Sequence, residues 1–465
     1  MTNPSELVER ALAAASGASI IVLVEQDSRA DLRWARSTLT TNGERTTTSA
    51  TVIAFHERPS GTGTATLSAS GPTADSMAEL VSAAQSAAKD APDARDAEPL
   101  FRDAPVAPEW SSLAPTTSAQ ALAPVASALG DVFARAAADD IEHFGYAEHG
   151  ITTTWLGSST GLRLRWSQPS GRVEMTAKSH GRTRSAWQGA AAEDVATIDI
   201  RGLDADLRQG LTWQTRRLDI TPGRHHALLS AGAVADLACE IWWSATARDA
   251  FEGRSVFSAA GGGARFGEQL TPRGITMASD PFDPLLPSCP FIATQQSSSH
   301  SSVFDNGIGL TRTEWLSGGR LSRLIAPRAT AAEFRLNTND ATPASADNLV
   351  ISDSAGHGNL ADLIARTERA LLVTCVWYNR VVDPQSLLLT GLTRDGVYVI
   401  EHGEVIGAAS NFRFNESPVG MLARVSDATA TGRTQPREMG DYVHRIAAPA
   451  LSVEGFNFST VSDAL

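Results

Sequence analysis

The sequence predicts an α+β fold, because stretches with helical periodicity and stretches with strand-like alternation follow one another in mixed order. Its length of 465 residues exceeds the usual size of one domain and indicates two or three packed units. Hydrophobic residues make up 42% of the chain and charged residues 20%, which is typical of soluble globular proteins and argues against a fibrous or largely disordered chain. We find no convincing short repeat.

The first predicted unit covers residues 1–100 and combines helices with strands. Ser5 is a candidate N-cap for an opening helix whose apolar residues have helical spacing. Apolar alternation and turn-forming residues predict the elements that follow. In order, these are a short buried strand at residues 19–26, a strand at 32–41 that ends in a turn at Asn42-Gly43, a strand at 49–56, a loop at 59–63 and a helix at 73–88.

A change of composition marks the next boundary. Residues 90–124 are rich in Ala, Pro, Asp and Ser, and this proline content favours an extended connection between domains. The middle unit, residues 118–218, is expected to begin with a helix after Pro124 and to continue as sheet. Its strands are expected at residues 162–166 and around 173–175, joined by a turn at Pro169-Ser170-Gly171, with another hairpin turn at Gly157–Gly161.

The third predicted unit, residues 224–463, is rich in strands. A strand at residues 225–230 is expected to lead into a helix with Val234, Leu237, Ala238 and Ile241 facing inward. Further along, the pattern predicts a helix at 360–367, strands at 371–377 and 397–401, and a turn at His402-Gly403 into a strand at 404–406.

Charge and cysteine content restrict the partners and the compartment. The chain has 39 Lys and Arg against 52 Asp and Glu, a net charge of −13 that repels phosphate backbones, so we expect no nucleic-acid partner. Cys239, Cys289 and Cys375 are too few for a disulfide framework and suit the cytoplasm. The acidic amino terminus does not resemble a signal peptide, and no apolar run is long enough to span a membrane, so no membrane partner is expected.

Common catalytic motifs are missing from the sequence. The Gly-rich segment 261–267 lacks the Lys-Ser/Thr of a P-loop and the Gly-x-Gly-x-x-Gly spacing, and is interpreted as a loop. No Gly-x-Ser-x-Gly elbow is present, although residue counts alone leave a Ser-His-Asp set from distant segments open. The histidines are scattered, and the adjacent pair His225-His226 lies on a predicted strand, where neighbouring side chains point to opposite faces.

The order of several segments resembles the TldD/PmbA family, also called modulators of DNA gyrase, and more specifically its PmbA (TldE) branch. The resemblance extends over nearly the whole chain and is strongest at Phe251–Phe257, which contains a Gly-x-Ser-x-Phe segment. The other segments that carry it are Thr221–Arg224, Gly274–Pro281, Asp347–Ile351 and Val399–Glu404. It implies a TldD/PmbA-like α+β fold, with an N-terminal α/β sandwich-like domain, a sheet-rich middle region and a mixed, β-rich C-terminal domain.

The resemblance also implies where a metal site has been lost. TldD-type chains carry His-Glu-x-x-x-His on the helix after the strand at 225–230 and bind zinc there, whereas this sequence lacks that pattern. One register places Cys239 and Ser244 at the histidine positions and Glu240 at the acid, with the bulky Trp242 and Trp243 between them. We therefore expect a degenerate metal-site helix, with no catalytic residue and no metal ligand in this chain.

The expected function is that of a non-catalytic PmbA/TldE-like subunit of a zinc metallopeptidase that acts on unfolded or extended peptides. The resemblance implies a heterodimer with a TldD-like subunit, which would hold the zinc. A peptide could add a strand to an exposed sheet edge, and Trp315 or Trp377 could line a contact surface. Two alternatives stay open: a stand-alone peptide-binding or regulatory protein, and an active peptidase that uses an unrecognised site such as Cys239 with a distant His.

Overall fold

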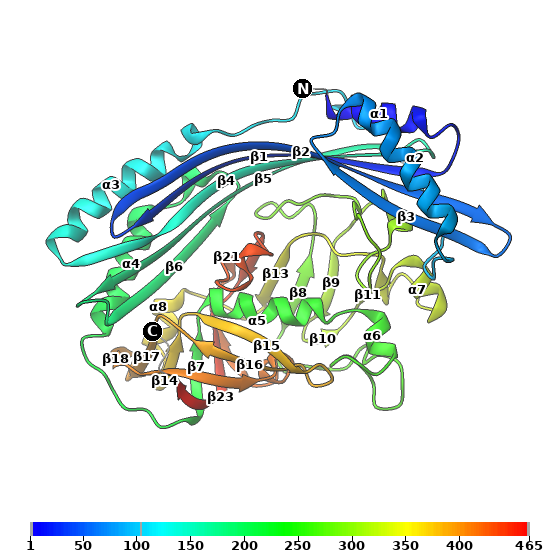
Figure 1. Cartoon of the computed structure of the whole chain (residues 1–465). Coiled ribbons are helices and arrows are strands. Elements are labelled where there is room, and N and C mark those ends of the chain that lie inside the picture. The colour runs from blue at the N-terminus through cyan, green and yellow to red at the C-terminus, as the bar shows by residue number, and fades with distance from the viewer. Residues whose placement is uncertain (1–2, 103–104, 463–465) are drawn as a thin grey trace.

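The computed structural model describes residues 3–102 and 105–462. An N-terminal sheet arches over a C-terminal body that contains two larger sheets, a short two-stranded sheet and a central helix (Figure 1). The first two residues of the predicted 1–100 unit, and residue 463 of the predicted 224–463 unit, lie outside the described residues.

The arch is one antiparallel sheet with the strand order β3-β2-β1-β4-β5-β6. Its strands are β1 (Ile20–Ala35), β2 (Thr38–Arg58), β3 (Gly61–Ser70), β4 (Ile141–Ser158), β5 (Arg163–Ser179) and β6 (Arg184–Ala192). The predicted units 1–100 and 118–218 thus contribute strands to the same sheet, although a connection without regular strands separates them in the sequence. Their limits as domains stay predictions.

Helices cover one face of the arch, with α1 (Pro4–Ala14) and α2 (Ala74–Asp90) near one end and α3 (Ala123–Ala138) and α4 (Ile200–Trp213) near the other (Figure 1). Strand alternation explains this two-sided packing. Ile20 and Val22 of β1 belong to the core beneath α1 and α2, whereas Ile21 and Leu23 face the C-terminal body. Short 3-10 turns, Ala119–Leu122 and Val195–Thr197, precede α3 and α4.

The long strands β1 and β2 correct two sequence-based expectations. The chain reverses at Arg36 and Ser37, which have φ angles of +52° and +54°, and not at Asn42-Gly43. Asn42 and Gly43 lie within β2, opposite Leu32 and Asp31. The predicted strand at 19–26 and the first part of the predicted strand at 32–41 belong to one continuous strand, β1, which ends just before the reversal. Leu32 and Trp34 continue the buried alternation of this strand.

The expected turn at Pro169-Ser170-Gly171 is also wrong, since β5 continues through it as one strand. Pro169 pairs with Ile151 of β4, while β6 pairs with β5 from Gly171 onward. Pro169 therefore lies where the outer edge of β5 is open, and a proline that cannot donate a ladder hydrogen bond is tolerated at an edge. The turn at Gly157–Gly161 is confirmed as the connection between β4 and β5.

The C-terminal body contains a large mixed sheet, a smaller mixed sheet and a short parallel pair. The large sheet consists of β7 (Gly223–Leu229), β14 (Arg369–Val373), β15 (Val376–Asp383), β16 (Leu388–Thr393), β17 (Val397–Glu401), β18 (Glu404–Ala408), β19 (Asn411–Glu416), β20 (Val425–Ala428) and β23 (Leu451–Ser462). The smaller sheet consists of β8 (Ile275–Ser279), β9 (Thr313–Ser317), β10 (Arg320–Leu321), β13 (Leu349–Asp353), β21 (Gly432–Thr434) and β22 (Ile446–Ala448). The pair is β11 (Leu324–Ile325) with β12 (Ala341–Thr342).

The helix α5 (Ala231–Trp243) is central to this body (Figure 1). Its side chains share one core with residues of both C-terminal sheets, for example Leu229 of β7 and Ile351 of β13. Residues Ala233–Trp242 of this helix are all buried, Asp236 and Glu240 included, so the helix is enclosed by the two sheets and the segments around it. The remaining helices are shorter: α6 (Ala247–Phe251), α7 (Arg328–Glu333), α8 (Leu360–Ala365), α9 (Pro418–Leu422) and the 3-10 turns Val303–Asp305 and Met439–Asp441.

Smaller corrections concern individual residues. The N-cap of α1 is Asn3, whose side chain accepts a hydrogen bond from the backbone N–H of Ser5. The expected strand at 371–377 breaks after Val373 and resumes at Val376. Trp315 is 2% exposed and cannot line a surface, whereas Trp377 is half-buried.

One helical stretch bears on the expectation that no segment is long enough to span a membrane. Residues Ala119–Ala138 are long and apolar enough to do so by length and composition alone. In the structure its apolar residues Val125, Leu129 and Val132 are buried in the core that α3 and α4 share with the arch. This stripe is accounted for by packing on the sheet.

Candidate functional site

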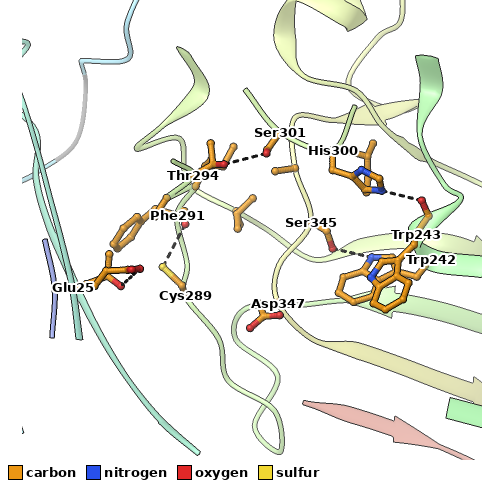
Figure 2. A pocket seen from close by; sticks show the side chains of 16 residues that line it. Glu25, Trp242, Trp243, Cys289, Phe291, Thr294, His300, Ser301, Ser345 and Asp347 are labelled. Carbon is orange, nitrogen blue, oxygen red and sulfur yellow. Dashed lines mark hydrogen bonds between the residues drawn. The ribbon is translucent and has the colours of Figure 1, made fainter. Parts of the chain in front are cut away.

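A pocket of about 380 Å³ lies between the arch and the C-terminal body (Figure 2). The arch contributes Glu25 of β1 and Thr154 of β4, and the body contributes the end of α5, Ile325 of β11 and loop residues. The full lining is Glu25, Thr154, Trp242, Trp243, Cys289, Phe291, Ile292, Ala293, Thr294, His300, Ser301, Leu310, Ile325, Ala344, Ser345 and Asp347. Its volume and its mainly apolar lining with a few polar groups are typical of ligand-binding pockets.

Strand alternation places the acidic group on the arch side. Glu25 follows Ile21 and Leu23 at intervals of two residues, so its side chain points to the same inner face. Its carboxylate accepts hydrogen bonds from Thr154 Oγ1, at 3.4 Å, and from Gln295 Nε2, at 3.2 Å. Burial is the main reason why the pKa of Glu25 is raised above its ordinary value.

The opposite wall is fixed by a chain of hydrogen bonds. Trp242 Nε1 donates to Ser345 Oγ at 3.0 Å, and Ser345 Oγ lies 3.2 Å from Ser279 Oγ. Ser279 also accepts a hydrogen bond from Trp315 Nε1 at 3.0 Å. Because buried indole N–H groups need an acceptor, this arrangement holds the Trp242 ring in one orientation.

Two other pocket groups are already engaged. His300 Nε2 donates to the carbonyl oxygen of Trp243 at 2.8 Å, so this histidine is oriented by the end of α5. Cys289 Sγ donates to the carbonyl oxygen of Phe291, and burial raises the pKa of Cys289 to about 12. A thiol in this state is a poor nucleophile.

The structure separates the five residues of the predicted metal-site helix. Trp242 and Trp243 line the pocket, whereas Cys239, Glu240 and Ser244 do not. Cys239 is fully buried, and burial raises its pKa well above the ordinary value. Ser244 caps α5, and its Oγ donates to the carbonyl oxygen of Glu240 at 2.8 Å.

Glu240 faces a different environment from the pocket. It is 9% exposed, and burial together with the neighbouring Glu438 raises its pKa to about 7, while Arg380 acts in the opposite direction. Both Glu438 and Arg380 belong to segments that pack beside α5, and Arg380 Nη1 contacts Glu438 Oε1 at 3.0 Å. Glu240 thus belongs to a charged group with Glu438 and Arg380, and it is not among the residues that line the pocket.

Asp236, which no motif in the sequence marks, is the most strongly held acid of α5. It is fully buried and accepts hydrogen bonds of 2.9–3.0 Å from the backbone N–H groups of Arg437, Glu438 and Met439. Burial raises the pKa of Asp236 to about 8, although these three donors favour its charged form. Its role is to fix the segment 437–439 against α5.

The residues of α5 do not fit the zinc site that a TldD-type chain would have. Zinc needs several imidazole, thiolate or carboxylate groups directed at one point. Here Cys239 is buried in the core, Ser244 caps the helix and Glu240 faces Glu438, so their donor atoms do not converge. Within residues 3–102 and 105–462, no three His, Cys, Asp or Glu side chains form a group that could hold a metal ion.

Of the residues singled out from the sequence as the degenerate metal-site helix, Trp242 and Trp243 line the pocket, and the sequence did not predict the pocket itself. Glu25 and His300 are pocket residues that no local motif marks, and Asp347 was noted only as the first residue of a segment that carries the family resemblance. The alternation of apolar residues in β1 gave a usable signal for Glu25, since it showed which face the side chain takes. Nothing in the sequence indicated that this face lies opposite Trp242, more than two hundred residues away.

The sequence matches the family model of the PmbA/TldA metallopeptidase C-terminal domain over residues 222–460, just over half of the chain. No curated protein gives a significant match. Solved structures of similar fold include TldE from Thermococcus kodakarensis (TM-score 0.73, 14% identity, 97% of this chain and 99% of that chain covered) and two candidate modulators of DNA gyrase, from Thermotoga maritima (0.75, 14%, 97% and 99%) and Bacteroides thetaiotaomicron (0.77, 11%, 98% and 98%). At these identities, the likeness shows a shared fold.

Proposed function

Because the chain belongs to the TldD/PmbA family of metallopeptidase-related proteins, we propose that it is a non-catalytic subunit that pairs with a TldD-like, zinc-containing chain. In this proposal it contributes a peptide-binding surface, and the partner performs the hydrolysis. Its three cysteines are all unpaired, in keeping with a cytoplasmic location.

The observation that carries the proposal is the contrast between the end of α5, where Trp242 and Trp243 line the pocket, and the polar residues of the helix, which do not line it. The end of the helix borders an apolar pocket with a fixed tryptophan, which is suited to hold a peptide side chain. The polar groups of the helix are engaged elsewhere, Asp236 by backbone donors and Ser244 by the helix end. The scaffold of a binding site is thus kept without a converging set of zinc ligands.

The likeness to TldE from Thermococcus kodakarensis, over almost the full length of both chains, supports the proposal at the level of architecture. A chain that keeps a family scaffold but lacks its metal ligands can still form one wall of a shared chamber and bury a large permanent interface. Catalysis would then depend on the partner, and substrate binding would depend on both chains.

Co-expression with a TldD-like chain that carries His-Glu-x-x-x-His tests the proposal. We expect a stoichiometric complex in which zinc is bound by the partner and peptidase activity requires both chains. The matched control is a partner in which both histidines are replaced by alanine, which should form the complex without zinc or activity. Tightly bound zinc and peptide turnover in the isolated chain would contradict the proposal, as would its failure to form a complex.

A further inference from the structure

The pocket between the arch and the body has an uneven distribution of charge. Its lining residues include two carboxylates, Glu25 and Asp347, and neither lysine nor arginine. Asp347 forms an ion pair with Arg445. Glu25 has no such partner: among the described residues its polar contacts are neutral donors, Thr154 and Gln295.

A carboxylate in this position has lost part of its hydration without gaining a cation. Burial raises the pKa of Glu25, and the nearby Asp27 adds to this effect. Such a group gains more from a positively charged ligand than an exposed carboxylate does, because the surroundings are less polar than water. The net charge of −13 also attracts cations to the protein as a whole.

The opposite end of the pocket favours an apolar group. Trp242 and Trp243 lie across the cavity from Glu25 (Figure 2), and the lining also includes the aliphatic side chains of Ile292, Leu310 and Ile325. The volume of about 380 Å³ is more than twice the roughly 150 Å³ that accommodates one benzene molecule. The pocket therefore has space for two side-chain-sized groups of different character.

We propose that this pocket selects peptide segments in which a large apolar side chain lies next to a positively charged group. The apolar side chain packs against Trp242 and Trp243, and the cation pairs with Glu25. The cation is a Lys or Arg side chain or a free terminal amine, which share this chemistry. The inference rests on the proposed function, since it names the peptide class that the non-catalytic subunit holds.

Calorimetric titration of the full chain with short peptides tests the selection. The reference peptide has capped ends and a central Phe-Lys pair, and the comparison peptides carry Phe-Glu or Ser-Lys at the same place. We expect the reference peptide to bind about tenfold more tightly than either. An uncapped peptide that begins with Phe and lacks Lys distinguishes a terminal amine from a side chain as the source of the cation.

Variants of the chain separate charge from folding. Glu25→Gln keeps the size and hydrogen-bonding groups of the side chain and should reduce the preference for Lys over Glu by about five- to tenfold. Glu57→Gln, an exposed position on β2, makes the same change in net charge and should leave the preference unchanged. Ala293→Lys adds a cation at an exposed position of the pocket lining and should reverse the preference, whereas Ala293→Gln should not.

The outcomes distinguish this inference from the proposed function. If the peptides bind but Phe-Glu binds as tightly as Phe-Lys, or if Glu25→Gln and Ala293→Lys both leave the preference unchanged, the selection is refuted and peptide binding stands. If no peptide binds either the chain or its complex with a TldD-like partner, the peptide-binding role itself is refuted.

Discussion

Two carboxylates one helical turn apart on α5 show how the surroundings of a residue decide its role. Asp236 accepts hydrogen bonds from three backbone N–H groups in the core and so fixes the segment 437–439 against α5. Glu240 has Glu438 as a neighbour and, among the described residues, is held by no comparable set of donors. Both have a raised pKa, but the first acid stabilises its neighbours and the second stabilises the fold only while it is protonated.

Asp236 is expected to be essential for stability. Asp236→Asn leaves one of the three buried N–H groups without an acceptor and should lower the free energy of unfolding by about 1–3 kcal/mol. Asp236→Ala leaves all three without one and should cost more. Urea denaturation measures both changes, and equal effects of the two substitutions would show that these hydrogen bonds do not carry the role.

Glu240 predicts a dependence of stability on pH. Its pKa is about 7 in the folded protein and 4.5 for the ordinary group. Between these values the folded chain holds a proton that the unfolded chain has lost, so rising pH lowers the free energy of unfolding. Glu240→Gln removes this loss of stability. The free energy of unfolding of the variant should therefore exceed that of the wild type by an amount that grows between these two pH values. At pH values above 7 the difference should reach about 1–3 kcal/mol.

Urea denaturation at several pH values between 5.5 and 8 checks this expectation, at the order of magnitude that pKa arguments allow. The control is Glu57→Gln, which makes the same substitution at an exposed position and should show a difference from the wild type that does not grow with pH. A constant difference for Glu240→Gln would contradict the assignment.

Among the helices and strands, close packing fixes the outer layer of the arch. Gly157 of β4 lies beneath α1, and a Cβ atom there would lie 2.3 Å from Val8 Cγ1. The absence of a side chain thus allows the helix to approach the sheet closely. The side chains of Leu7, Val8 and Ala11 of α1 are buried against the sheet. The close contact between α1 and β4 therefore stabilises a substantial part of the N-terminal core.

Gly157→Ala is expected to displace α1 and lower stability by about 1–3 kcal/mol, because overpacking strains a filled core. Gly130→Ala is the matched control. Gly130 lies in α3, and a Cβ atom there would meet no described atom within 4 Å apart from the neighbouring backbone of its own helix. This control should stabilise the protein by about 0.5–1 kcal/mol through helix propensity. Thermal unfolding of the two variants compares them directly, and equal shifts would contradict the packing argument.

Across the molecule as a whole, Arg437 connects the arch to the C-terminal body. Its guanidinium lies 5.2 Å from the ring centre of Trp187 on β6 and 5.3 Å from that of Trp377 on β15. It also pairs with Asp395, which accepts a hydrogen bond from Ser185 of β6 at 2.6 Å. These contacts join β6 of the arch to β15 and to the loop that carries Asp395 in the C-terminal body.

Arg437→Met is expected to cost about 3 kcal/mol, because it leaves the buried Asp395 carboxylate without its closest cation. Adding Asp395→Asn should recover part of this loss, since the two residues act as a pair. Arg201→Met removes an exposed ion pair with Asp131 and should change stability by less than about 0.5 kcal/mol. Urea denaturation gives the energies, and hydrogen exchange in β6 should accelerate only for Arg437→Met.

The local sequence pattern was sufficient to predict a helix, strand or turn where the neighbouring residues in the sequence decide the local structure. The helix α2, the strand and helix at 225–241 and the hairpin turn after β4 follow from periodicity and turn chemistry. It failed at Asn42-Gly43 and Pro169, where pairing with β1 and β4 overrides the turn preference of those residues.

The order of residues was enough to establish the mixed α+β class, the inward-facing residues Val234, Leu237, Ala238 and Ile241 of α5 and the lack of a His-Glu-x-x-x-His pattern, because these depend only on which residues stand within a few positions of each other. Folding in three dimensions was needed to show that predicted units 1–100 and 118–218 share one sheet and that Glu25 faces Trp242 across a pocket. Strand register and packing join segments far apart in the chain, and no local propensity records which segments meet.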